Sequence, residues 1–210
     1  MKTALACLTV MLAAGLALAG ITAAFSVFTK EQARRLQVLQ NRPVLEPVTL
    51  VESQGQEFIL NRAVQESGKF WLIDFIYTRC NAVCRTQGTD FQRMQRAIVA
   101  QGLQDKVSLL SISFDPAHDR PEVLARYAAH YDADPAIWRF ATVKDAASLP
   151  KLLAFFGITV IPDEWGGYQH NAALLLVNPQ ARLVRVMDID SEAWKPLLQQ
   201  VQRSRQPERA

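Results

Sequence analysis

Residues 70–85 read FWLIDFIYTRCNAVCR, an apolar run that leads directly into two cysteines. The run Phe70–Tyr77 contains a single charged residue and is typical of a strand that is buried on both faces of a sheet. A helical period of apolar residues follows to about Gln101. Cys80 and Cys84 therefore stand at a strand-to-helix turn, where two thiols form either a redox couple or a metal site.

Strands and helices are expected to alternate along the rest of the chain. Glycine in Gln54-Gly55-Gln56 predicts an early hairpin, and the apolar run Val107–Asp115 predicts a second buried strand that ends before Pro116. Pro121 suits the first turn of a helix, with Asp119 or Arg120 just before it. This alternation predicts an α/β sandwich around one central mixed sheet. The remaining expected elements are strands at 138–143, 172–177 and 182–188 and helices at 146–156 and after Ser191, which would cap the last one.

The composition limits the number of domains that the chain can form, but it excludes few functions. The chain has 210 residues, of which 50% are hydrophobic and 20% charged, which allows one well-buried domain. Lys and Arg number 23 against 20 Asp and Glu, and no basic run interleaved with aromatic residues occurs. We therefore expect no nucleic-acid partner.

The N-terminal segment carries no charged side chain over Thr3–Thr29, and 27 helical residues would span about 40 Å, more than the hydrocarbon core of a bilayer. We expect an uncleaved membrane anchor here. Ala17-Leu18-Ala19 leaves a cleaved secretory signal as the alternative. Cys7 lies too near the start to favour a lipoprotein and is interpreted as a small apolar residue of the anchor.

The basic residues around this segment give a conflicting indication of topology. Lys30, Arg34 and Arg35 follow the apolar run, whereas only Lys2 precedes it, which by the positive-inside rule opposes export of the C-terminal part. The N-terminal tail is very short, so we still expect the large domain to be exported. An exported domain meets an oxidising compartment, where two close thiols tend to pair unless a metal or a reductant holds them.

Several motifs in a fixed order resemble a known family. The segment LIDFIYTRCNAVCR, with strands and helices around it, resembles the thioredoxin fold. Ser113-Phe114-Asp115-Pro116, the run DRPEVL at 119–124, the three residues between the cysteines, and His170 ahead of a strand and an Asn-Pro hairpin resemble the Sco/SenC family. The resemblance covers roughly residues 45–203. Together with the uncharged N-terminal run, it predicts a membrane anchor or signal at 1–29, a polar stalk at 30–45 that is helical over Lys30–Gln40, a thioredoxin-like domain at 46–205 and a tail at 206–210.

The same resemblance implies a function in copper handling. Cys80, Cys84 and His170 would bind a copper ion, and the protein would be an assembly factor for the dinuclear copper centre of cytochrome c oxidase rather than an enzyme. Thiolates suit Cu(I) and imidazole suits both Cu(I) and Cu(II), so the residue types agree with this. The partners would be the copper-site subunit of the oxidase and other copper carriers or thiol reductants. The domain would lie outside the cytoplasm, in the periplasm or on the outer face of the inner membrane, tethered through residues 3–29.

Other residues receive a secondary or a structural interpretation. Asp74 matches a buried carboxylate near the dithiol of thioredoxins and could assist proton transfer, or it could be a hydrogen-bonded acid of the core. Asp115 is interpreted first as a cap of the Pro turn and second as an accessory to the metal. Arg85 and Asn81 stand where the family usually has proline, which makes the turn more electropositive. His118 and His130 are interpreted as solvated side chains.

Two other functions remain open. A thiol-disulfide oxidoreductase acting on extracytoplasmic proteins would use Cys80 and Cys84 for exchange, with His170 incidental or tuning thiol pKa. Three residues between the cysteines, instead of the usual two, count against it. A structural disulfide in an interaction domain is the third interpretation, and a strand-to-helix turn is an unusual place for one.

Overall fold

The computed structural model describes residues 2–21, 29–80, 83–164, 166–189 and 192–203, with only the backbone described at residues 4, 5, 21 and 83–86. The chain divides into two compact units, Met1–Asn41 and Arg42–Ala210. The first unit contains α1 (Lys2–Ile21) and α2 (Lys30–Asn41). In α2, Glu31 pairs with Arg34 and Arg35 at 2.9 Å each, three and four residues ahead, which supports the helix predicted for the polar stalk.

The prediction of a membrane-spanning helix over residues 3–29 is corrected. Within the described stretches of the chain, no helix is both long enough and apolar enough to cross a bilayer. The prediction rested on the absence of charge, but α1 covers 20 residues, of which six are alanine, two glycine and two threonine, and these small side chains contribute little apolar surface. Residues 22–28 of the predicted span lie outside the described residues.

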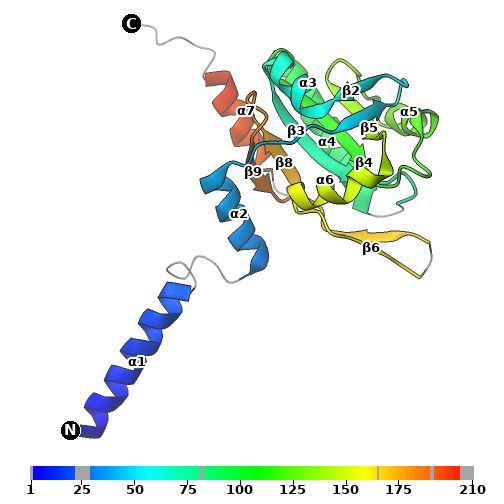
Figure 1. The fold of residues 1–210 in the computed structure, drawn as a ribbon. Helices are drawn as coiled ribbons and strands as arrows, with labels where there is room; N and C mark the ends of the chain where they lie inside the picture. Colours follow the sequence, from blue (N-terminus) through cyan, green and yellow to red (C-terminus); the bar gives the residue numbers. More distant parts are fainter. Residues whose placement is uncertain (1, 22–28, 81–82, 165, 190–191, 204–210) are drawn as a thin grey trace, which may run out of the picture. The chain divides into compact units, whose positions relative to one another are not determined.

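The second unit is built on a seven-stranded mixed sheet in the order β2-β1-β5-β4-β3-β8-β9 (Figure 1). The central strands β3, β4 and β5 are parallel, and the flanking strands join them antiparallel. Parallel neighbours require crossover helices, and α4 and α5 are the connections. The strands are β1 (Thr49–Glu52), β2 (Glu57–Ile59), β3 (Phe70–Ile76), β4 (Val107–Ser113), β5 (Trp138–Val143), β8 (Leu174–Val177) and β9 (Leu183–Met187).

Helices cover both faces of this sheet. Successive residues of β3 point to opposite faces of the sheet, and the side chains on both faces are buried. Phe75 packs against Phe156 of α6 at 5.5 Å between ring centroids. On the other face, Phe91 of α4 packs against Trp138 of β5 at 5.6 Å. Asp74 and Trp138 share this second face, since Asp74 pairs with Ser111 and the Trp138 indole donates to the Ser111 hydroxyl at 3.0 Å. The helices are α3 (Leu60–Ser67), α4 (Val83–Ala100), α5 (Pro121–His130), the 3₁₀ turn η1 (Ala146–Ser148), α6 (Leu149–Phe156) and α7 (Trp194–Arg203).

The predicted alternation of strands and helices and the central mixed sheet are confirmed. Two elements were not predicted: α3, and a separate two-stranded sheet formed by β6 (Val160–Pro162) and β7 (Tyr168–His170). Figure 1 shows this β6–β7 hairpin, in yellow, extending from the body of the sandwich. Ser191, the predicted cap of the last helix, lies outside the described residues, and α7 begins at Trp194.

Gly88 of α4 lies directly against the ring of Tyr131, the residue that follows α5. A Cβ at position 88 would overlap the Tyr131 ring, with the ring hydroxyl at 2.7 Å. We expect Gly88→Ala to lower the free energy of unfolding by about 1–3 kcal/mol, because overpacking outweighs the better helix propensity of alanine. Urea unfolding followed by tryptophan fluorescence measures this. Arg96→Ala, at an exposed residue of the same helix, is the control. A Gly88→Ala variant that is more stable than the wild type would show that the Tyr131 ring can move aside at little cost in free energy.

Candidate functional site

The two cysteines lie at the junction between the end of β3 and the start of α4. Tyr77 to Cys80 form the turn after β3, which we call the cysteine turn, and the Cys80 amide donates to the Tyr77 carbonyl at 3.3 Å. Cys80 is half-buried. The backbone of Cys84 lies in the first turn of α4, where exposed amides and the helix dipole favour a thiolate. The side chains of Cys84 and Arg85, and Asn81 altogether, lie outside the described residues.

His170 is the last residue of β7 and pairs with Val160 of β6, so it stands on a strand rather than in a loop. Its half-buried ring lies 5.0 Å from the Phe114 ring and 6.3 Å from the Tyr77 ring, between centroids. Burial lowers the pKa of His170, against the opposing effect of its hydrogen bond to the Asn171 carbonyl. The imidazole is therefore neutral to a lower pH than an ordinary histidine, as a metal ligand must be.

The tautomer of His170 follows from this hydrogen bond. Nδ1 lies 3.3 Å from the Asn171 carbonyl oxygen, which can only accept, so Nδ1 carries the proton. In the neutral ring the lone pair then resides on Nε2. Histidines that bind metals commonly donate their other nitrogen to a carbonyl in this way.

Cys80 and His170 are 90 residues apart in sequence and meet at Tyr77. The cysteine turn closes on the Tyr77 carbonyl, and the His170 ring packs beside the Tyr77 ring. That Cys80, Cys84 and His170 share one site stays a prediction, since the Cys84 side chain lies outside the described residues. The sequence predictions missed Tyr77, whose only signal was its position directly after the buried strand.

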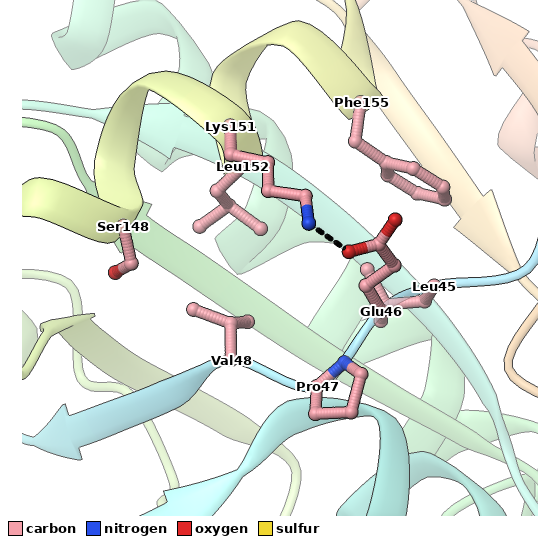
Figure 2. Close-up of a pocket in the computed structure, with 8 residues that line it drawn as sticks. All are labelled: Leu45, Glu46, Pro47, Val48, Ser148, Lys151, Leu152 and Phe155. Atoms are coloured by element: carbon pink, nitrogen blue, oxygen red, sulfur yellow. Dashed lines mark ion pairs between the residues drawn. The ribbon is translucent and has the colours of Figure 1, made fainter.

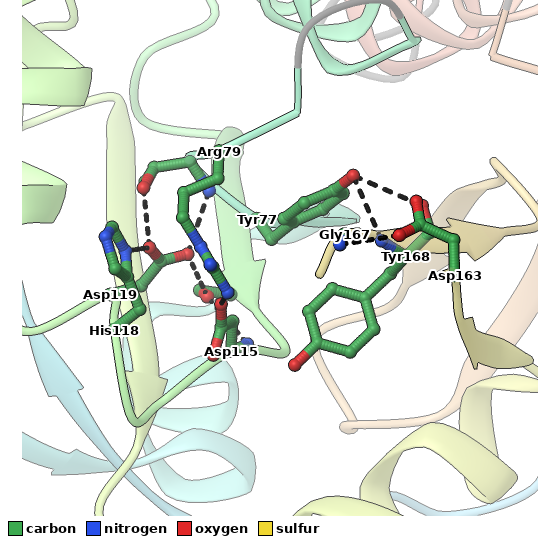
Figure 3. A network of polar contacts seen from close by, with 10 residues as sticks. Tyr77, Arg79, Asp115, His118, Asp119, Asp163, Gly167 and Tyr168 are labelled. Carbon is green, nitrogen blue, oxygen red and sulfur yellow. Dashed lines mark hydrogen bonds and ion pairs between the residues drawn. The ribbon is translucent and has the colours of Figure 1, made fainter. Parts of the chain in front are cut away.

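Figure 3 shows a second group of polar residues against the cysteine turn, contributed by the loop 115–119, which we call the acid loop. Asp119 is fully buried, and its two oxygens accept from the Thr78 amide at 2.9 Å and the Thr78 hydroxyl at 2.6 Å. They also accept from the Ser113 hydroxyl at 2.6 Å, and His118 Nδ1 lies at 3.0 Å. Asp119 therefore fixes the start of the cysteine turn.

Two sequence interpretations of the acid loop are refined. Asp115 pairs with Arg79 at 2.7 Å, next to Cys80, so its carboxylate holds the cysteine turn as well as ending the strand. Of the two residues noted ahead of Pro121, Arg120 occupies the capping position of α5, and Asp119 is buried. Carboxylate and imidazole atoms of Asp115, His118 and Asp119 lie within 4.8 Å of one another. Arg79, Thr78 and Ser113 account for these carboxylates without a metal ion.

Asp74 lies beneath α4, with 1% of its surface exposed. Burial raises its pKa from 3.8 to about 7, against the opposing hydrogen bond from Ser111. Its Oδ1 has no hydrogen-bond partner among the described residues, and the same holds for both amide atoms of the fully buried Gln87. Gln87 precedes Phe91 by one helical turn of α4, so two incompletely bonded polar groups lie on the side of the sheet that α4 covers.

A small pocket lies elsewhere on this unit and includes none of the predicted site residues. Figure 2 shows it between α6 and the segment before β1, with Lys151 paired to Glu46 at its rim. Its volume is about 80 Å³. The lining is mainly apolar and offers no cluster of reactive groups. The lining residues are Leu45, Glu46, Pro47, Val48, Ser148, Lys151, Leu152 and Phe155.

The sheet order, the helices on both faces and the cysteines between a central strand and the next helix define a thioredoxin-like protein. The family model for SCO1/SenC matches residues 37–205. The chain belongs to the SCO1/SenC family.

Individual relatives agree with this assignment. The SCO1 protein homolog of Bacillus subtilis strain 168 is 27% identical over 143 residues, which cover 67% of this chain and 72% of the relative. A SCO1/SenC family lipoprotein from Bacillus anthracis matches with a TM-score of 0.68 and 22% identity, over 76% of this chain and 94% of the other. ScoI of Bradyrhizobium japonicum, solved with copper bound, matches with a TM-score of 0.60 and 25% identity, over 75% and 99%.

Proposed function

We propose that this chain binds one copper ion through Cys80, Cys84 and His170 and serves the assembly of the dinuclear copper centre of cytochrome c oxidase. The observation that carries the proposal is the meeting of the cysteine turn and the His170 ring at Tyr77. Membership of the SCO1/SenC family supports it, as does the copper bound to the Bradyrhizobium relative.

The chemistry of the donor set fits copper. Thiolate sulfur is a soft ligand that suits Cu(I), and a neutral imidazole suits both oxidation states. The lone pair of His170 resides on Nε2, and burial keeps the ring neutral. A three-ligand site leaves a position open, which suits an ion that is handed to another protein better than a closed four-ligand site does.

The cysteine pair has a second chemical capacity when copper is absent. Cys80 and Cys84 can join in a disulfide, giving up two electrons and two protons to a partner's disulfide, which becomes two thiols. The helix N-terminus at Cys84 favours the thiolate that both copper binding and exchange require. This chemistry belongs outside the cytoplasm, where we place the second unit.

A Cu(I) competition titration on the full chain, reduced and free of oxygen, tests the proposal. The wild type is expected to bind one equivalent. His170→Ala and Cys84→Ser are each expected to weaken binding by roughly 100-fold or more, since even outer partners of metal ligands are worth about 10- to 100-fold. His130→Ala, which removes an imidazole at the end of α5, is the matched control. Wild-type affinity in His170→Ala would rule out the three-ligand site.

The oxidoreductase remains the rival function, because Cys84 stands in the first turn of a helix, where exchange-active thiols are activated. Its test is the reduction of a model disulfide by the metal-free protein. Efficient turnover that survives His170→Ala, together with weak copper binding, would favour this rival.

A further inference from the structure

The β6–β7 hairpin that carries His170 forms a sheet of its own. Within the described residues, neither of its strands pairs with the seven-stranded sheet. At its base, the Asn171 side chain accepts from the Thr159 amide at 2.6 Å and donates to the Gly157 carbonyl at 3.0 Å. These bonds attach the base of the hairpin to the end of α6. They do not fix the position of β7 relative to the end of β3.

The hydroxyl of Tyr77 links the end of β3 to β7. It donates to the Tyr168 carbonyl at 3.2 Å and accepts from the Tyr168 amide at 3.3 Å, so one side-chain oxygen satisfies both backbone groups of one residue of β7 (Figure 3). Tyr77 directly follows β3 and is 6% exposed. Its backbone carbonyl meanwhile accepts from the Cys80 amide. A single residue therefore connects the cysteine turn with the strand of His170.

Ring packing alone would not fix this geometry. The Tyr168 ring stands edge-on to the Tyr77 and Phe114 rings, at 5.3 and 5.6 Å between centroids. Such contacts bury apolar surface but allow sliding, because their energy varies slowly with position. Hydrogen bonds to the Tyr168 backbone define a register, since they weaken steeply with misalignment.

We infer that Tyr77 is a positioning residue of the copper site: its hydroxyl holds β7 so that His170 faces the cysteines. The inference rests on the proposed function. It predicts that the hydroxyl contributes to copper binding only through His170 and leaves the cysteines unaffected.

Tyr77→Phe is the test, because it removes the hydroxyl and retains the ring. Cu(I) affinity of the full chain is expected to fall about three- to tenfold, the effect of losing one or two ordinary hydrogen bonds. In the His170→Ala background the same substitution is expected to change nothing, so that the double-mutant cycle is non-additive. The reaction rate of the thiols with a disulfide reagent is expected to stay within twofold.

Amide hydrogen exchange on the metal-free chain gives a readout independent of copper. The Tyr168 amide is expected to exchange at least about threefold faster in Tyr77→Phe, whereas amides of β3 keep their rates. Tyr127→Phe, which removes a hydroxyl on α5, is the matched control and should leave Tyr168 unchanged.

The outcomes separate the two proposals. Unchanged copper affinity or unchanged Tyr168 exchange in Tyr77→Phe would overturn the role of Tyr77, as would additive losses in the cycle. If the wild type fails to bind copper, or His170→Ala binds as the wild type does, the proposed function fails, and exchange at Tyr168 alone decides whether the hydroxyl positions β7.

Discussion

Asp74→Asn is expected to gain roughly 4 kcal/mol of stability relative to the wild type between pH 4 and pH 8. The pKa of Asp74 is 3.8 in its ordinary state and about 7 in the fold, where burial disfavours the charged form. The folded protein thus binds the proton more tightly than the unfolded chain, and the stability from this residue is lost as the pH rises through 7. About three pKa units at 1.36 kcal/mol each give the magnitude.

Urea unfolding of both proteins at pH 4, 5.5 and 8 measures this effect. At pH 4 the two should differ little in the contribution from ionisation, because Asp74 is protonated in the fold and the pH lies close to its ordinary pKa of 3.8, at which the unfolded chain still binds part of the proton. Asp105→Asn, at an exposed carboxylate, is the control and should show no such trend. A difference between Asp74→Asn and the wild type that does not vary with pH would mean that Asp74 ionises normally in the fold.

Asp119→Ala is expected to lower the free energy of unfolding by about 3–5 kcal/mol at pH 7. The carboxylate is fully buried, and its removal leaves the Thr78 amide and the hydroxyls of Thr78 and Ser113 without their acceptor. Asp119→Asn keeps the shape and one acceptor oxygen, so a smaller loss is expected. Asp90→Ala is the matched control, because Asp90 is a buried acid of α4 that pairs with Arg93, one helical turn away.

Chemical denaturation of the three variants gives the comparison. A loss below about 1 kcal/mol in Asp119→Ala would indicate that water or a shift of the acid loop replaces the carboxylate. In that case the start of the cysteine turn would not depend on Asp119.

Where the chain has a strong hydrophobic period, the sequence predicted the fold closely. The strand expected at 138–143 is β5 with the same bounds, and the run 70–77 differs from β3 by one residue. Both strands are central in the sheet and buried on both faces, so their residues are apolar almost throughout. The stalk helix expected over Lys30–Gln40 is α2, which begins at Lys30 and ends at Asn41.

The missed elements depend on contacts that sequence periodicity does not contain. β6 and β7 have three residues each, too few for alternation, and β6 ends in proline. A side chain 91 residues earlier holds β7 in place. Asp119 could equally have capped a helix by its position before Pro121, and only the tertiary fold turns it inward. The N-terminal prediction rested on the absence of charge over Thr3–Thr29, which does not by itself give a helix the hydropathy that a membrane span needs.

The two edges of the seven-stranded sheet bear on how the protein resists aggregation. The edge strand β2 has only three residues, and Glu57 at its start pairs with Lys144, which places charge along the open side. At the other edge, residues 43–45 run beside the start of β9 and pair with its backbone. The Leu183 amide donates to the Pro43 carbonyl at 3.0 Å, and the Leu45 amide donates to the Ala181 carbonyl at 2.8 Å. Short, charged or covered edges are poor templates for a strand from another chain. The seven-stranded sheet is thereby discouraged from stacking onto the sheet of another copy.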